Sequence, residues 1–229
     1  MSRVFPSGNT NALVSASQFL TSLNDFSAAF WAYRTGTVGF TDNIVGSVES
    51  SVSSGWTLKF VATTNVVQAH YIAATTNKVR LSTTALTLNA WTHIVITHKN
   101  TGLLSTDFLF YFNGKQEAGT DVSSQVGAHG NLATRMTIGF VSGATAPVNI
   151  GPVTVWNRML SPSEALALAA GTHPLRFREG LVDFWNMQSS YIEEGWIKGI
   201  LLVPTTPNPG VAINPRMEPP VIWPQIASY

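Results

Sequence analysis

Short runs of apolar and β-branched residues recur along the chain up to residue 156, and Ser-, Gly- and Asn-rich stretches separate them. Runs spaced roughly 8–12 residues apart are typical of the strands of an all-β sandwich. The predicted strands cover residues 26–33, 38–45, 56–62, 66–73, 78–81, 91–97, 108–112, 135–140 and 149–156. We therefore predict an all-β fold in which two antiparallel sheets pack face to face.

The clearest hairpin signal lies in residues 90–119. Residues 91–97 are β-branched, aromatic or His, which suits a buried strand. The run Phe108–Phe112 is apolar at every position, so we expect both of its faces to be covered. Asn113 and Gly114 then offer the two positive φ angles of a type I′ hairpin turn. This unit fixes the predicted fold class.

A helix signal follows the last of these strands. Ser161 and Glu164 match a capping box, and Pro162 occupies the first helical position. Residues 165–170 favour a helix, and Gly171 is a natural stop. The sequence therefore predicts one short helix that packs against the sandwich.

The character of the chain changes after this helix. Leu181–Trp185 is one more plausible strand, but seven of the twelve prolines lie beyond Val203. Proline fixes φ and removes a hydrogen-bond donor, so we expect this last segment to be extended and outside any sheet interior. We predict three parts: a β-sandwich domain over 1–171, an extension with one strand over 172–203, and a Pro-rich arm over 204–229.

The arm is too apolar to be a free tail. Large apolar side chains on a free tail would be exposed to water, so we expect the arm to lie along another protein surface. Docking on a neighbouring subunit and folding back onto its own domain are both open, and we favour the first. The predicted partner-binding residues are Trp196, Val211, Ile213, Met217, Ile222, Trp223 and Tyr229.

Composition narrows the classes of function. Charged residues make up 11% of the chain, well below the ~25% of an ordinary soluble domain. This suits a component of an assembly, or an uncharged extracellular-type domain. A net charge of +1 gives no basic footprint for nucleic acid. The absence of cysteine excludes disulfides, thiolate zinc sites and a cysteine nucleophile.

Signals of secretion and membrane insertion in the sequence also bear on where the protein acts. The first residues lack the apolar core of a secretory signal, and no run of about 18 apolar residues suggests a membrane span. We therefore expect no membrane partner, and we expect synthesis in a cytoplasm and release without secretory export.

Several segments, taken in order, resemble the laminin G-like domains of the concanavalin A-like lectin/glucanase superfamily. These segments are Phe-Trp-Ala at residues 30–32, Gly-Trp-Thr-Leu at 55–58, Ala-Trp-Thr-His-Ile-Val at 90–95, Phe-Tyr-Phe-Asn-Gly-Lys at 110–115, Met-Thr-Ile-Gly at 136–139 and the strand, turn and helix at 153–164. The resemblance covers about residues 10–171 and implies a jelly-roll sandwich. Residues 180–185 and 219–224 are similar to the tails of laminin G-like proteins encoded by bacteriophages.

The carboxylates and histidines of this sequence do not match the spacing of a catalytic site. The family includes glycoside hydrolases, whose retaining members need two carboxylates about 5–5.5 Å apart. No Glu-x-Asp-x-x-Glu pattern occurs, and the adjacent pair Glu193 and Glu194 would face opposite sides of a strand. His93 and His98 lie five residues apart on a predicted strand, so they also face opposite ways and make a poor shared metal site. We predict that the protein is not an enzyme.

Two kinds of ligand stay open. Many members of the family bind calcium through loop oxygens, so a calcium ion near Asp42 or Asp121 is not excluded, although both residues also suit ordinary turns. Otherwise we expect no cofactor. Sugar binding needs exposed aromatic rings. We expect Trp31, Trp56, Trp91 and Trp156 in the core, whereas Trp185, Trp196 and Trp223 could stack on sugars or anchor the arm.

Together these features favour a non-enzymatic structural virion protein of a bacteriophage, such as a capsid decoration protein. We expect it to contact the major capsid protein or another virion protein, to form a homo-oligomer, and to be a trimer by analogy with decoration proteins. The alternative is a carbohydrate-binding module that adheres to host or mucosal glycans. In both cases function resides at surfaces and not in a catalytic centre.

Overall fold

The structure is a computed structural model of the 229-residue chain. It describes residues 2–5, 12–15, 25–36, 42–46, 55–61, 63–73, 76–99, 107–122, 135–139, 148–187, 193–197, 201–204 and 213–214.

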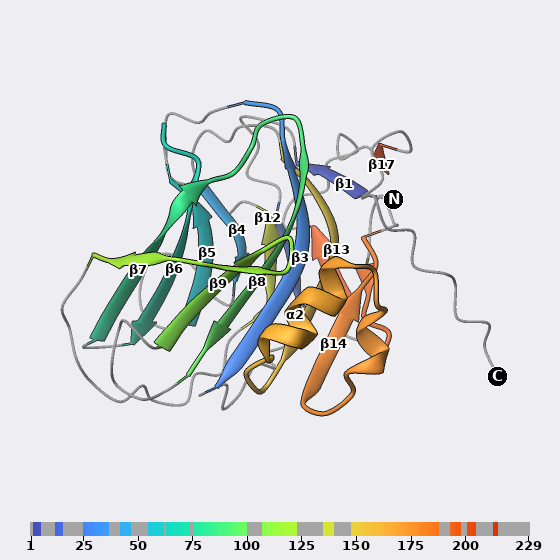
Figure 1. The fold of residues 1–229 in the computed structure, drawn as a ribbon. Coiled ribbons are helices and arrows are strands. Elements are labelled where there is room, and N and C mark those ends of the chain that lie inside the picture. The colour runs from blue at the N-terminus through green and yellow to red at the C-terminus, as the bar shows by residue number, and fades with distance from the viewer. Residues whose placement is uncertain are drawn as a thin grey trace.

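The described strands form two antiparallel sheets (Figure 1). Sheet A runs in the order β10 (Lys115–Glu117), β9 (Phe108–Phe112), β8 (Trp91–His98), β3 (Phe26–Arg34), β13 (Val148–Trp156), β1 (Ser2–Phe5) and β17 (Ile213–Asn214), and β14 (Leu181–Trp185) also pairs with β13. Sheet B runs in the order β11 (Gly119–Asp121), β7 (Thr76–Ala85), β6 (Val66–Ala73), β5 (Gly55–Phe60), β4 (Asp42–Gly46), β12 (Thr137–Gly139), β2 (Ala12–Ser15), β16 (Leu201–Pro204) and β15 (Glu193–Glu194). The predicted all-β, two-sheet sandwich is confirmed.

The core lies between the inner faces of the two sheets. Phe26 of sheet A stacks on Trp56 of sheet B with ring centroids 4.6 Å apart, and both side chains are buried. Alternate residues of the central strands supply this core, such as Ile94 and Ile96 of β8, because successive side chains in a strand point to opposite faces.

The hairpin at β9 and β10 behaves as its sequence predicts. Phe108 and Phe110 lie in the inter-sheet core, whereas Tyr111 packs in a second cluster on the outer face of sheet A. Both faces of the strand are therefore covered. Asn113 and Gly114 have φ angles of 50° and 79°, as a type I′ turn requires.

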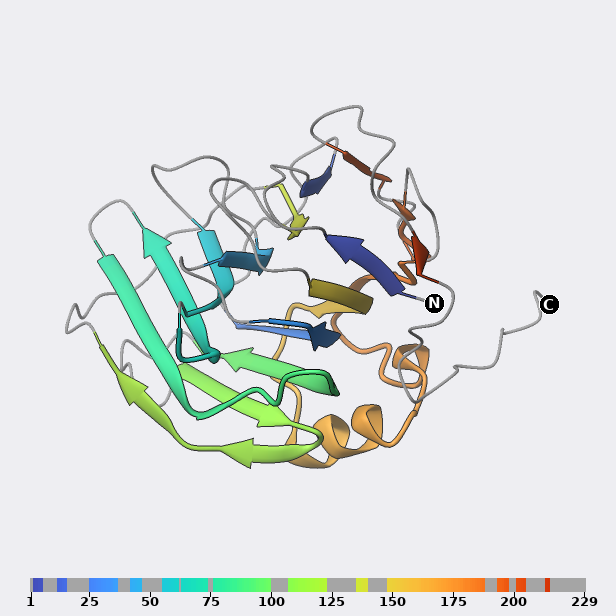
Figure 2. The ribbon, with the colours of Figure 1, turned by 90° about the horizontal axis from the view of Figure 1, so that it is seen from above.

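The second cluster is closed by the helix α2 (Pro162–Ala169), which lies on the outer side of sheet A (Figure 2). Ala165 and Leu168 of α2 are buried against Tyr111 and Trp156. The predicted capping box is present, because the Ser161 hydroxyl accepts from the Glu164 N–H and the Glu164 carboxylate accepts from the Ser161 N–H. The helix is thus held by both its apolar face and its cap.

The Glu164 carboxylate also binds Arg158 in a two-point ion pair, with N–O distances of 2.9 and 2.6 Å. The hydrogen bonds from Arg158 lower the pKa of Glu164 to about 2. We expect Glu164→Gln to lower the free energy of unfolding by about 1 kcal/mol at neutral pH. Because the folded-state pKa is depressed, the contribution of the carboxylate is present above its unfolded pKa and is lost as the pH falls toward 2.

Urea denaturation of wild type and Glu164→Gln between neutral pH and pH 2 tests this prediction. The two stabilities should converge at low pH, while Glu179→Gln, which removes an exposed carboxylate that acts on Arg158 only through its charge, should change stability by less than Glu164→Gln. A constant difference between wild type and Glu164→Gln at every pH would contradict the role given to this carboxylate.

The C-terminal part of the chain adds strands to both sheets. β14 pairs with β13, β16 pairs with β2, and β17 pairs with β1. The extension predicted over 172–203 therefore holds β15 and the start of β16 as well as the strand at Leu181–Trp185 that the sequence indicated. No helix in the part of the chain that the structure describes is long and apolar enough to cross a membrane.

Candidate functional site

The described tryptophans divide sharply by exposure. Trp156 and Trp185 are fully buried, and Trp31 and Trp56 are nearly so, as core positions require. Trp91 is half-buried. Trp196, by contrast, is 46% exposed. Trp185 is therefore excluded as a platform for a ligand. Trp196 is the most exposed indole among the described residues.

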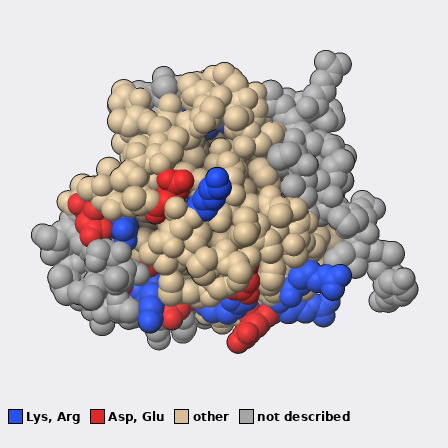
Figure 3. Space-filling model, in the orientation of Figure 1, with Lys and Arg blue, Asp and Glu red and all other residues tan. Residues whose placement is uncertain are grey.

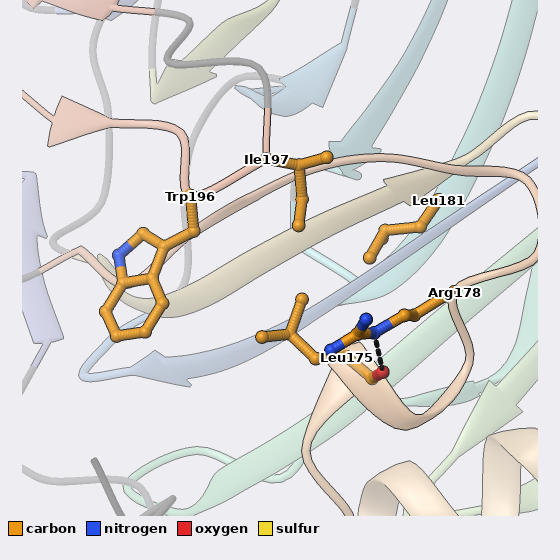
Figure 4. Close-up of a pocket in the computed structure, with 5 residues that line it drawn as sticks. All are labelled: Leu175, Arg178, Leu181, Trp196 and Ile197. Carbon is orange, nitrogen blue, oxygen red and sulfur yellow. Dashed lines mark hydrogen bonds between the residues drawn. The ribbon is translucent and has the colours of Figure 1, made fainter. Parts of the chain in front are cut away.

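Trp196 lines a pocket of about 390 Å³ on the surface of the domain (Figure 4). The lining residues of this Trp196 pocket are Leu175, Arg178, Leu181, Trp196 and Ile197. They come from three places: the 3₁₀ helix η1 (Pro174–Arg176) and the residues after it, the start of β14, and the turn after β15. The pocket thus unites segments that are about 20 residues apart in sequence.

Asp183 fixes the segment that carries Trp196. Its buried carboxylate oxygen Oδ1 accepts hydrogen bonds from the N–H groups of Phe184 and Ile197, at 2.8 and 2.9 Å. The Trp196 N–H donates to the Phe184 carbonyl at 3.0 Å. Gly195 lies directly against the Asp183 carboxylate, where a Cβ atom would overlap it. The backbone on either side of Trp196 is therefore tied to β14.

Aromatic contacts orient the indole itself. The Trp196 ring meets the buried Phe184 ring edge to face at 5.6 Å, and the His173 ring lies at 6.3 Å. His173 caps η1, with its Nδ1 accepting from the Leu175 N–H at 3.2 Å. Burial lowers the pKa of His173 below its usual 6.5, which favours a neutral ring at physiological pH. One side of the indole is thereby packed and the rest is left to solvent.

Arg178 supplies the polar side of the pocket. Its Nε donates to the Leu175 carbonyl at 3.2 Å, which holds the exposed guanidinium against η1 (Figure 4). A guanidinium only donates hydrogen bonds, so it selects ligand hydroxyl, carbonyl or carboxylate oxygens. The five described lining residues include no carboxylate, so none of these five can serve as the acid or base of glycoside hydrolysis. The Trp196 ring beside the Arg178 guanidinium is therefore suited to bind a ligand that has an apolar face and oxygen acceptors.

The residues considered for calcium are not brought together. Asp121 forms an ion pair with Arg80 at 3.6 Å, and it lies on β11. Asp42 lies on β4, with β7, β6 and β5 between the two strands. Across the residues that the structure describes, no group of three or more His, Asp or Glu side chains could hold a metal ion.

The two histidines of β8 face opposite sides of sheet A, as predicted. His98 lies in the inter-sheet core and stacks on Phe26 and Tyr71. His93 lies on the outer face beside Trp31, with ring centroids 5.0 Å apart. Burial lowers the pKa of His93 to about 3, so this ring is neutral and structural.

The predicted partner-binding residues fall mostly outside the described part of the chain. Trp196 lies in the Trp196 pocket, and the backbone of Ile213 lies on β17, paired with Arg3 of β1. The remaining members of the set, Val211, Met217, Ile222, Trp223 and Tyr229, lie outside the described residues.

Comparison with known families gives one broad match. A family model described as the concanavalin A-like lectin/glucanases superfamily matches residues 7–165. A search of curated proteins found no match.

Solved structures share the fold at low identity. A Bacteroides ovatus protein proposed to bind carbohydrate is 16% identical, with a TM-score of 0.62 over 90% of this chain and 58% of that one. A heptameric SAP-like pentraxin from Limulus polyphemus is 13% identical, with a TM-score of 0.60 over 92% and 93% of the two chains. Botulinum neurotoxin type C, whose cell entry depends on two ganglioside molecules, is 15% identical, with a TM-score of 0.50 over 74% and 46%. The chain thus spans 58% of the length of the Bacteroides ovatus protein.

Proposed function

Because the chain belongs to the concanavalin A-like lectin/glucanase superfamily, we propose that it is a non-enzymatic carbohydrate-binding protein whose saccharide site is the Trp196 pocket. The observation that carries this proposal is the exposure of Trp196. Trp196 is 46% exposed, and its ring packs on Phe184 while Asp183 holds the backbone of the next residue, whereas Trp185, the other candidate platform in the described residues, is fully buried.

The chemistry of the pocket fits a sugar. A saccharide ring has an apolar face that can pack on an indole, and hydroxyl groups around its rim that accept hydrogen bonds from a guanidinium. The volume of about 390 Å³ lies within the range of small-ligand sites. Leu175, Leu181 and Ile197 supply the remaining apolar wall. The carbohydrate binding proposed for the Bacteroides ovatus protein and the ganglioside dependence of the neurotoxin support the same class of ligand.

We expect Trp196→Ala to weaken glycan binding by roughly tenfold to a hundredfold, because a large aromatic side chain at the centre of a site carries much of the binding energy. A glycan array followed by titration calorimetry with the best-binding oligosaccharide measures the effect. Leu166→Ala is the matched control, since Leu166 is a 55% exposed apolar residue on α2, outside the pocket lining.

Three results would contradict the proposal. The first is a wild-type protein that binds no glycan on the array. The second is a Trp196→Ala protein that binds the same oligosaccharide as tightly as wild type while both show the same thermal unfolding midpoint. Equal losses in Trp196→Ala and Leu166→Ala would also count against a site at the Trp196 pocket.

A virion role is a second proposal, and the surface favours it. On the face shown in Figure 3, charged side chains gather mainly in the lower half, and the upper half of the described surface is almost entirely uncharged. Such a surface suits a homo-oligomeric component of a bacteriophage particle that contacts a capsid protein. Deletion of residues 204–229 should then leave the sandwich folded but abolish binding to depleted particles. Unchanged binding after the deletion would contradict this role for the arm.

A further inference from the structure

Basic side chains of β7, the strand next to the edge strand β11, lie near one edge of the sandwich. Lys78 and Arg80 pair across sheet B with Tyr71 and Ala69, whose side chains are buried in the inter-sheet core. Because directly paired residues share one face of a sheet, Lys78 and Arg80 also point inward, toward sheet A. Arg80 donates to the Phe108 carbonyl of β9 at 2.8 Å. The edge is therefore joined to sheet A by polar contacts.

The deepest of these contacts joins Lys78 to Asp107, the residue before β9. The ammonium nitrogen Nζ of Lys78 touches the carboxyl oxygen Oδ2 of Asp107, and both side chains are 0% exposed. The Lys99 N–H donates to the Asp107 carbonyl at 2.7 Å, which fixes the backbone there. This amine and this carboxyl group are thus held together inside the protein.

Aromatic residues lie next to this pair in the strand register and in the chain. Tyr71, the strand partner of Lys78, stacks on His98 with ring centroids 5.2 Å apart. His98 in turn packs on Phe108, the neighbour of Asp107, at 4.7 Å. Rings of this kind exclude water from the contact and lower the local dielectric constant.

Such surroundings disfavour the charged form of the Lys78 amine. An isolated charge costs much free energy in a low dielectric, and a buried ion pair recovers it only with further hydrogen bonds. Within the described residues, Nζ of Lys78 makes no hydrogen bond. Desolvation lowers the pKa of Lys78 to about 8, which raises the fraction of neutral amine at neutral pH above that of an exposed lysine. When one proton moves from the ammonium to the carboxylate within the pair, the neutral amine is a nucleophile that faces an electrophilic carboxyl group.

We propose that Lys78 and Asp107 condense into an intramolecular isopeptide bond that links sheet B to sheet A. Nζ attacks Cγ of the protonated carboxyl group, and one N–H proton passes to a carboxyl oxygen. The C–O bond of the resulting hydroxyl group then breaks, and a second proton leaves with it as water. The product is one secondary amide and one water molecule, so no oxidant, reductant or co-reactant is needed.

Proximity makes this step feasible. Groups held in contact react as if present at effective molarities of roughly 10⁵–10⁸ M, and exclusion of water opposes the reverse hydrolysis. The bond would constrain the unfolded chain as a disulfide does, in a protein without cysteine. Its position between two sheets would also resist their separation.

The mass of the purified full-length wild-type protein, measured under denaturing conditions, tests the proposal. The expected mass is that of the sequence less one water molecule. Tandem mass spectrometry of a protease digest should give one branched peptide that joins Lys78 to Asp107. A wild-type protein of full sequence mass, or a water loss localised anywhere else in the chain, would overturn the proposal.

Two variants sharpen the assignment. Lys78→Arg should show the full sequence mass, because a guanidinium does not form this amide. Lys115→Met, which changes an exposed lysine on β10, should keep the loss of one water. A misfolded Lys78→Arg chain would also lack the bond, so the wild-type mass and the branched peptide are the decisive measurements. Retention of the water loss in Lys78→Arg would contradict the assignment.

Discussion

Replacement of Trp185 by alanine is expected to lower the free energy of unfolding by roughly 3–5 kcal/mol. Trp185 is fully buried on β14, where it pairs with Val153 and belongs to the inter-sheet core. Its removal leaves a large cavity that the two sheets cannot fill without moving. Urea denaturation followed by far-ultraviolet circular dichroism measures the change.

Trp196→Ala is the matched control for this prediction. Its side chain is 46% exposed, so its loss should change the free energy of unfolding by about 1 kcal/mol or less. The two substitutions therefore separate a structural tryptophan from a binding one. Equal denaturation midpoints for Trp185→Ala and wild type would show that Trp185 is not a core residue.

Asp183→Ala is expected to lower the free energy of unfolding by about 1–3 kcal/mol and to weaken glycan binding as strongly as Trp196→Ala. The substitution leaves the N–H groups of Phe184 and Ile197 without their shared acceptor. The segment next to β14 then loses the tie through Ile197 and keeps the hydrogen bond from the Trp196 N–H to the Phe184 carbonyl. Urea denaturation and calorimetric titration of the same sample measure both effects.

Asp183→Asn isolates the reason for this effect. The amide oxygen of asparagine can still accept from both N–H groups, so binding should stay within a few-fold of wild type. If Asp183→Ala binds normally, or if Asp183→Asn loses as much affinity as Asp183→Ala, the carboxylate does not position Trp196 through these two hydrogen bonds.

The long, strongly patterned elements were predictable from the sequence. Residues 66–73 and 108–112 form strands with the predicted bounds, and the helix at 162–169 carries the predicted capping box. These segments combine local propensity with burial on one or both faces, so local and tertiary preferences agree. The family match and the shared fold of solved structures confirm the predicted family and jelly-roll architecture.

The short strands were not predictable. β10 and β11 have three residues each and are largely exposed, and β17 has two. Strands of this length bury too few side chains to leave a period-two pattern. Their positions follow from the neighbours that they pair with, which a local pattern does not reveal.

The candidate site could likewise be predicted from the sequence only in part. Trp185 lies on a predicted strand and is buried, whereas Trp196 lies outside every predicted strand and is exposed. This difference was a usable signal for choosing between the two tryptophans. The Trp196 pocket itself needs η1, β14 and residues 196–197 to meet, and Lys78 meets Asp107 only across two sheets. Such contacts leave no sequence motif.

The most direct test of a saccharide site at the Trp196 pocket is the set of tryptophan indole N–H signals in a nitrogen–proton correlation spectrum. The chain has seven tryptophans, and single substitutions assign their signals. On addition of the best-binding oligosaccharide from the array, the Trp196 signal should shift with saturation, and the signals of the buried Trp156 and Trp185 should stay in place. Saturable binding that leaves the Trp196 signal unmoved would contradict the account.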